Sequence, residues 1–207
     1  MVIAIDGPAG TGKSTVARAV AERLGFTYLD TGAMYRAVAL AADRTGRPAA
    51  EVAEHIDIEL GDRVLLAGED VTETIRTPEI TAETSKVAAD PSVRQALVRR
   101  QQEIVAAGDW VAEGRDIGTV VAPDAAVKVF LTATAEVRAR RRAEQTGGDY
   151  ATILNDQADR DARDASADRS IFEAPPDTTP VDTTELTIEQ VIDQIATLVV
   201  EAKEIGA

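Results

Sequence analysis

Near the start of the chain stands Gly7-Pro8-Ala9-Gly10-Thr11-Gly12-Lys13-Ser14, the stretch that decides the fold. The apolar run 2–5 before it predicts a buried strand. In the segment 14–24 after it, Val16, Val20 and Leu24 recur every fourth residue, which predicts a helix with one apolar stripe. Strand, glycine loop and helix in this order are the context that the G-x-x-x-x-G-K-[ST] phosphate-binding pattern requires.

The chemistry of this loop suits a nucleoside triphosphate. Glycines lack a Cβ, so the backbone can turn its N–H groups inward around an anion, and the following helix adds its positive end. Lys13 is placed to reach the β- and γ-phosphates, and the Ser14 hydroxyl to ligate Mg²⁺. We expect ATP phosphates to bind across the whole run Gly7, Pro8, Ala9, Gly10, Thr11, Gly12, Lys13, Ser14 and Thr15. The alternative is a glycine-rich turn that only connects two elements.

The bulk properties of the chain restrict its class. Its 207 residues suffice for one α/β domain with inserts, and a single domain over 1–207 is expected. The formal net charge of -14 argues against nucleic acid or a membrane surface as a partner. There is no cysteine, so no thiolate metal site can form. No signal segment or membrane-length apolar run is visible, so we expect a cytoplasmic enzyme. We also expect a monomer.

The rest of the chain predicts a parallel sheet of about five strands with an insertion. Further strands are expected at 26–30, 110–113, 126–131 and 180–182, separated by helices, which implies right-handed crossovers. The segment 57–72 is different, with short alternating runs divided by glycines, and it predicts a small antiparallel meander. The fold class is therefore α/β, a three-layer phosphate-loop fold with a small antiparallel sheet in its insert and a short helical lid.

Several arginines lie where they could meet a second anion. Arg36 and Arg115 each follow a predicted strand end, and arginine suits bidentate phosphate contact. In the basic helix 135–145, the spacing of Arg138, Arg141 and Arg142 puts them on one face, where like charges repel unless an anion lies among them. The polar segment that follows has few apolar anchors, as expected of a mobile lid. Surface ion pairing with the many acidic residues is the competing interpretation.

Two carboxylates lie at the same predicted sheet edge. Glu113 ends the apolar strand 110–113, a position from which it could steady Mg²⁺ through water. Asp116 follows in the loop 115–118, where a turn residue satisfying local N–H groups is the alternative. The one histidine, His55, is interpreted as structural or incidental.

At these residues the chain resembles the bacterial cytidylate kinase family. The resemblance rests on the segments 5–14, Leu29-Asp30-Thr31-Gly32-Ala33-Met34-Tyr35-Arg36, Gly114-Arg115-Asp116-Ile117-Gly118-Thr119-Val120-Val121, and Arg160-Asp161 with Arg163-Asp164. It covers essentially the whole chain. Phosphate loops occur in many enzymes, whereas the second and third segments are much more specific.

This resemblance implies transfer of the ATP γ-phosphoryl group to CMP or dCMP, with Mg²⁺, in pyrimidine metabolism. It implies a monophosphate-binding insert at about 31–100 and a lid at about 138–168. Thr31, Arg36 and Arg115 would hold the CMP phosphate, and Ser85, Arg94 and Asp116 would read the cytosine. Arg160 and Asp164 would meet the ribose or the phosphates. The catalytic set would be Lys13, Arg138, Arg142, Arg160 and Arg163, with the lid arginines acting as an arginine finger supplied in cis.

One position departs from the pattern of the family. An arginine usually stands three residues past the aspartate that matches Asp164, and here that position is Ala167, with Arg169 two residues further on. Sugar contacts at this end of the lid are therefore left open.

Base recognition follows from the chemistry of cytosine. Its N4 group is a donor and a carboxylate such as Asp116 is its natural acceptor, whereas uracil presents a carbonyl there. Two alternatives stay open on the residues alone. One is a kinase of the same architecture for another acceptor, such as UMP, AMP or shikimate, and the other is a nucleotide-dependent regulatory switch.

Overall fold

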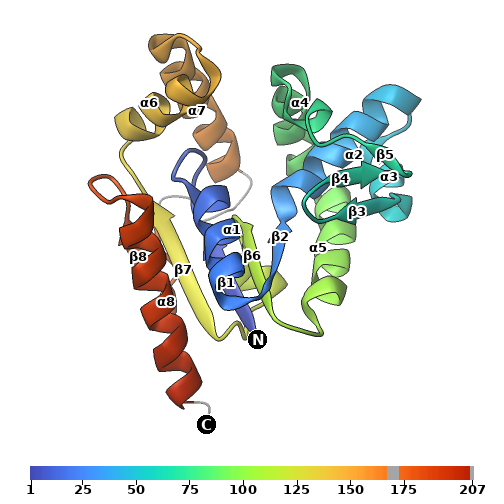
Figure 1. The fold of residues 1–207 in the computed structure, drawn as a ribbon. Helices are drawn as coiled ribbons and strands as arrows, with labels where there is room; N and C mark the ends of the chain where they lie inside the picture. The colour runs from blue at the N-terminus through green and yellow to red at the C-terminus, as the bar shows by residue number, and fades with distance from the viewer. Residues whose placement is uncertain (167–172, 206–207) are drawn as a thin grey trace. The chain divides into compact units, whose positions relative to one another are not determined.

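The computed structural model describes residues 1–166 and 173–205, and Ala167 and Arg169 lie outside them. The chain divides into two compact units, Met1–Tyr28 with Gly108–Ala207, and Leu29–Ala107. Figure 1 shows the elements of each unit along the chain.

The first unit is built on the larger sheet, whose strand order is β2-β6-β1-β7-β8. Strand β1 pairs in parallel with β6 and β7, and β7 pairs in parallel with β8. The predicted five-stranded parallel sheet is confirmed. The strands are β1 (Val2–Asp6), β2 (Thr27–Asp30), which ends in the second unit, β6 (Trp110–Gly114), β7 (Val127–Thr132) and β8 (Thr179–Asp182).

The helices of the first unit are α1 (Lys13–Leu24), α6 (Ala135–Thr146), α7 (Tyr150–Ser166) and α8 (Ile188–Ile205). Helix α1 packs against α8, and α6 lies side by side with α7 (Figure 1). The core between sheet and helices includes Ile3, Ile5, Val20, Leu131 and Ile195, all at most 1% exposed. The expected apolar stripe of α1 is formed by Val16 and Val20, with Leu24 partly buried beside the core.

The second unit contains helices α2 (Thr31–Thr45), α3 (Ala49–His55), α4 (Pro78–Ala89) and α5 (Pro91–Val105) and the 3-10 helix η1 (Thr74–Arg76). Its three short strands are β3 (Ile58–Leu60), β4 (Val64–Leu66) and β5 (Glu69–Asp70), which pair antiparallel in chain order. This is the predicted meander. A separate apolar core, with Met34, Val38, Ile75 and Leu97 fully buried, holds the unit together.

Two helix starts have capping signals in the sequence: Asp90-Pro91 predicts an N-cap with proline at N1, and Thr187 with Gln190 predicts a capping box. Asp90 caps α5 by accepting hydrogen bonds from the N–H groups of Ser92 and Val93, with Pro91 at the first helical position. At α8, Thr187 N–H donates to Gln190 Oε1 at 2.9 Å, and Gln190 N–H donates to Thr187 Oγ1 at 3.3 Å. This reciprocal pair is a capping box, which fixes where the terminal helix begins.

The segment after β6 differs from the prediction. A loop is expected at 115–118, whereas the structure forms a π-helix, η2 (Ile117–Val121). No helical periodicity marks these five residues in the sequence, because the contacts that hold them come from β1, more than a hundred positions away.

Candidate active site

The glycine loop joins β1 to α1 with a left-handed backbone at three positions. Gly7, Gly10 and Gly12 have φ values of +140°, +82° and +91°, where a side chain is strained. Gly12 is also the N-cap of α1 and has no side chain to satisfy the first N–H groups of the helix. Those donors, with the positive end of the helix dipole, suit an anion.

The lysine of the loop is folded back across it. Lys13 Nζ donates to the carbonyl oxygen of Pro8 at 2.6 Å, and Thr11 Oγ1 donates to the same oxygen at 3.1 Å. The pKa of Lys13 is lowered to about 7, first by burial and then by Arg115 and Arg160, against the opposing effect of Glu113 and Asp6. Burial and the two arginines thus disfavour the charged form of Lys13, whereas a bound polyphosphate would favour it.

The residues expected to hold the metal are a hydroxyl and a carboxylate. Ser14 is exposed in the first turn of α1. Glu113, in β6, is 4% exposed, and one of its carboxylate oxygens accepts a short hydrogen bond from the Tyr28 hydroxyl. Among residues 1–166 and 173–205 no group of three or more His, Cys, Asp or Glu could hold a metal ion by itself. Hydroxyl and carboxylate oxygens, such as those of Ser14 and Glu113, are hard ligands of the kind that suits Mg²⁺.

The start of η2 is held by Asp6, a buried carboxylate that was not among the predicted site residues. Asp6 Oδ1 accepts from Ile117 N–H at 2.9 Å, and Asp6 Oδ2 accepts from Gly118 N–H at 2.8 Å. Burial raises the pKa of Asp6 to about 6, against the lowering effect of these two hydrogen bonds. The only sequence signal was a charged residue at the end of an otherwise apolar strand. Asp6 thus fixes the segment that directly follows Asp116.

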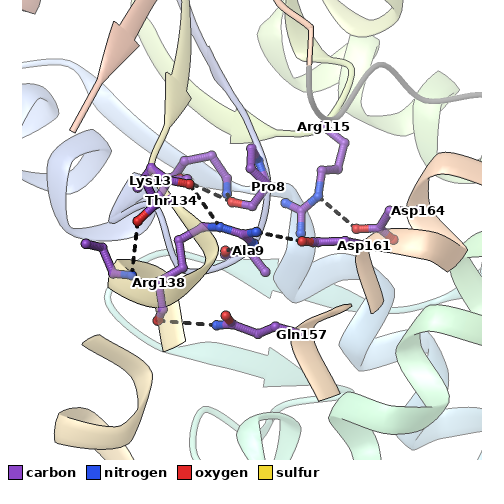
Figure 2. A network of polar contacts seen from close by, with 12 residues as sticks. Pro8, Ala9, Lys13, Arg115, Thr134, Arg138, Gln157, Asp161 and Asp164 are labelled. Atoms are coloured by element: carbon purple, nitrogen blue, oxygen red, sulfur yellow. Dashed lines mark hydrogen bonds and ion pairs between the residues drawn. The ribbon is translucent and has the colours of Figure 1, made fainter. Parts of the chain in front are cut away.

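The structure brings two of the expected substrate residues together. Arg115 Nε donates to Asp164 Oδ2 at 3.1 Å, and both side chains are largely buried. Asp164 belongs to α7, so this ion pair links the segment after β6 to that helix (Figure 2). Asp116 is half-buried next to Arg115 in the chain, and its carbonyl oxygen accepts from Val120 N–H.

The arginines of α6 and α7 differ in exposure and in hydrogen-bond partners. Arg138 is 4% exposed, Arg141 donates through both terminal nitrogens to Thr183, and Arg142 is exposed. On α7, Arg160 is half-buried, and Arg163 is exposed with its Nε donating to Asp159 O. Arg138 and Arg141 bind different neighbours, and helical spacing alone does not identify these partners.

The second unit carries the other expected substrate residues. Thr31 is buried in the first turn of α2, whose N-cap Asp30 accepts from Ala33 N–H at 2.9 Å. Arg36 Nη2 donates to the other oxygen of Asp30 at 2.8 Å. A Cβ on Gly32 would lie 3.0 Å from Arg36 Nη1, so the small residue lets the guanidinium fold back over the start of the helix.

Two further expected residues of the second unit lie on neighbouring helices that contact each other. Ser85, on α4, is buried, and Arg94, on α5, is half-buried. Their roles in reading a base stay predictions.

The fold and this loop define the class of the protein, a P-loop kinase. A family model described as cytidylate kinase matches residues 3–201. The chain belongs to the cytidylate kinase family.

Curated relatives agree over their full length. A cytidylate kinase of Mycobacterium avium (strain 104) is 47% identical over 223 residues, covering 100% of this chain and 98% of the relative. A cytidylate kinase of Caldanaerobacter subterraneus subsp. tengcongensis is 47% identical over 205 residues, covering 93% of this chain and 92% of the relative. Among solved structures, a gluconokinase from Sinorhizobium meliloti 1021 shares the fold, with a TM-score of 0.56, 18% identity, and 99% and 94% of the two chains covered.

Within the described residues, no helix combines the length and the apolar character that crossing a membrane would need.

Proposed function

We propose that this protein transfers the γ-phosphoryl group of ATP to CMP and dCMP, forming CDP and dCDP. The proposal rests on a phosphate loop whose buried Lys13 has a lowered pKa. The loop belongs to a chain that the cytidylate kinase family model matches over residues 3–201. Relatives named cytidylate kinase are similar across nearly their whole length, which supports the same reaction here.

The donor residues are those of the loop. Backbone N–H groups of residues 7–15 bind the phosphates of ATP, and the Lys13 ammonium leaves Pro8 O for the β- and γ-phosphate oxygens. The Ser14 hydroxyl and, through water, the Glu113 carboxylate hold Mg²⁺. Bound there, Mg²⁺ neutralises charge that develops on the transferred group. The chain forms no covalent intermediate in this reaction, so its residues position the reactants and stabilise charge.

In the first unit, Arg115 holds the phosphate of the acceptor and Asp116 accepts a hydrogen bond from N4 of cytosine. In the structure Arg115 pairs with Asp164. Arginine presents two parallel N–H groups to a phosphate, which favours replacement of Asp164 by the acceptor phosphate. Asp164, released from Arg115 by the incoming phosphate, is then free to accept hydrogen bonds from the sugar.

In the second unit, Thr31 and Arg36 add phosphate contacts at the start of α2, while Ser85 and Arg94 contact the base. The second unit is thereby assigned as the monophosphate-binding insert, 31–100. A helix N-terminus and a guanidinium are each favourable partners for a phosphate dianion.

The lid is assigned to α6 and α7 within 138–168, of which 167 and 168 lie outside the described residues. Arg142, Arg160 and Arg163 supply positive charge to the transferring phosphoryl group and exclude water, which would otherwise hydrolyse ATP. Two of these side chains are exposed on helices of the first unit, which supports their availability to a ligand.

We also propose that the enzyme works as a cytoplasmic monomer that binds no nucleic acid. A net charge of -14 repels polyanions, so anion binding is confined to the arginine-rich positions named above.

The test is an acceptor panel with ATP and Mg²⁺, read by ADP formation. We expect turnover with CMP and dCMP, weak turnover with UMP, and none with AMP or shikimate. Lys13→Ala should abolish turnover while circular dichroism shows an intact fold. Preference for AMP or shikimate would identify the other acceptor class, and ATP hydrolysis without any acceptor would favour a nucleotide switch.

A further inference from the structure

Arg138, near the start of α6, is surrounded by acceptors from three separate segments. Its Nε donates to Ala133 O at 3.2 Å, Nη1 to Ala9 O at 3.0 Å, and Nη2 to Asp161 Oδ2 at 2.7 Å (Figure 2). Every guanidinium nitrogen is therefore engaged by the protein itself, and the side chain is only 4% exposed. A residue held in this way has no open face to offer an incoming phosphate.

Two of the three acceptors identify what the arginine joins. Ala9 belongs to the phosphate loop, and Asp161 belongs to α7. The contact with Asp161 is an ion pair between side chains that are 4% and 7% exposed. Such a pair is costly to desolvate, and removing one partner leaves an uncompensated buried charge. The docking of α7 and the position of the Ala9 carbonyl are consequently linked through one guanidinium.

Packing at the neighbouring loop residue supports the same link. A Cβ on Gly10 would lie 3.0 Å from Arg138 Cβ and 3.0 Å from Gln157 Nε2. Gln157, one helical turn before Asp161 in α7, donates from Nε2 to Arg138 O at 3.3 Å. Gly10 in the phosphate loop therefore packs directly against Arg138 and against α7.

We propose that Arg138 and Asp161 are positioning residues that fix the phosphate loop at Ala9 and Gly10, so that the donor site is complete only while α7 is seated. This inference rests on the proposed binding of ATP by the loop. It replaces the expectation that Arg138 is a catalytic side chain contacting phosphate. Asp161 acts on the reaction only by holding Arg138 in place.

The consequence for catalysis is a coupling between lid and donor site. Without α7 seated against α6, Asp161 would not hold Arg138, and the Ala9 carbonyl would lose a fixed charged donor. The loop then presents a less ordered set of N–H groups to ATP. Hydrogen bonds to charged groups contribute more than neutral ones, so the effect on ATP binding is measurable.

The experiment compares Arg138→Met, Asp161→Asn, the double variant and the conservative Arg138→Lys with a matched control, Asp156→Asn. Asp156 is an exposed aspartate of α7. Two quantities are measured for each: Kd for a non-hydrolysable ATP analogue by titration calorimetry, and kcat and KM for ATP and for CMP.

We expect Arg138→Met and Asp161→Asn each to weaken the ATP analogue and raise KM for ATP by about tenfold or more. KM for CMP should change much less. The double variant should be no weaker than Arg138→Met, because both substitutions break one linkage. Arg138→Lys should recover part of the loss, and Asp156→Asn should match the unmodified protein.

Three results would overturn the inference. The first is a fall in kcat of Arg138→Met with unchanged affinity for the ATP analogue, which would indicate that Arg138 contacts the transferred phosphoryl group. The second is additivity of the two substitutions, and the third is unchanged affinity in Asp161→Asn. If Arg138→Met does not fold, Arg138→Lys and Asp161→Asn decide by the same titration. Analogue titration also separates this inference from the proposed function, since it requires no acceptor.

Discussion

At the scale of single residues, Lys13 has the clearest chemical consequence. Its pKa is lowered to about 7, so at pH 8 to 9 the amine of the free protein is largely neutral. Bound polyphosphate favours the charged form, which raises that pKa again. Binding of ATP above pH 7 must therefore take up a proton.

The prediction is an uptake approaching one proton per ATP at pH 8.5, falling as the pH approaches 6. Titration calorimetry in two buffers of different ionisation enthalpy measures it directly. Lys13→Arg is the matched control, because arginine stays charged throughout this range and should bind without uptake. An uptake near zero in the unmodified protein at pH 8.5 would contradict the assigned charge state.

Asp116 is the residue predicted to distinguish cytosine from uracil. Uracil offers an acceptor where cytosine offers N4, so Asp116 should cost UMP roughly 1–3 kcal/mol relative to CMP. Asp116→Ala should narrow the ratio of kcat/KM between CMP and UMP by a corresponding factor, mainly through loss of CMP activity. Asp124→Ala, at an exposed aspartate, should leave that ratio unchanged. An unaltered ratio in Asp116→Ala would remove Asp116 from base recognition.

At the scale of elements, the π-helix η2 depends on one carboxylate of β1. The pKa of Asp6 is raised to about 6 from 3.8, so the folded chain binds this proton more tightly than the unfolded chain. Between these two values the folded state holds more protons, and stability therefore decreases as the pH rises. Above pH 6 this contribution no longer changes.

We expect the free energy of unfolding of the natural protein, relative to Asp6→Asn, to fall by up to about 3 kcal/mol between pH 4 and pH 6.5. Urea unfolding of both proteins across this range provides the measurement, and taking the difference cancels the other carboxylates. Parallel pH profiles would show that Asp6 does not titrate in this window.

The glycine loop offers a second prediction at this scale. A Cβ on Gly7 would lie 2.1 Å from Leu131 O, whereas a Cβ on Gly25, the C-cap of α1, would meet nothing within 4 Å. Gly7→Ala should displace the loop and remove ATP binding. Gly25→Ala pays only for its left-handed backbone, about 1 kcal/mol, and should keep full binding. Calorimetry with ATP and thermal melts separate the two effects.

The elements also show which parts of the structure can be predicted from the sequence. Strand, loop and helix around Lys13, the meander at 57–72 and the caps at Asp90 and Thr187 follow from local patterns, and all of them are confirmed. Local patterns do not encode contacts between distant segments. The hydrogen bonds from η2 to Asp6 and from Arg138 to Ala9 join residues over a hundred positions apart, and Asp161 lies 23 positions from Arg138. Neither arrangement is predicted from the sequence.

At the scale of the whole molecule, the residues proposed for ATP and those proposed for CMP can be tested separately. A ligand that binds only the folded state stabilises it by about 2.7 kcal/mol at a hundred times its Kd. Arg36→Met should remove the stabilisation by CMP and keep that by ATP with Mg²⁺. Lys13→Met should do the reverse. Thermal melts with each nucleotide test both, and loss of both responses in either variant would contradict this division.

The crowding at Gly7 also bears on how this chain can be altered. The atom that blocks a Cβ there is the carbonyl oxygen of Leu131, part of the main chain and present whatever amino acid stands at position 131. No partner mutation at that site can make room. In a mutant library codon 7 should therefore stay invariant among active clones, even after rounds of selection that diversify its neighbours.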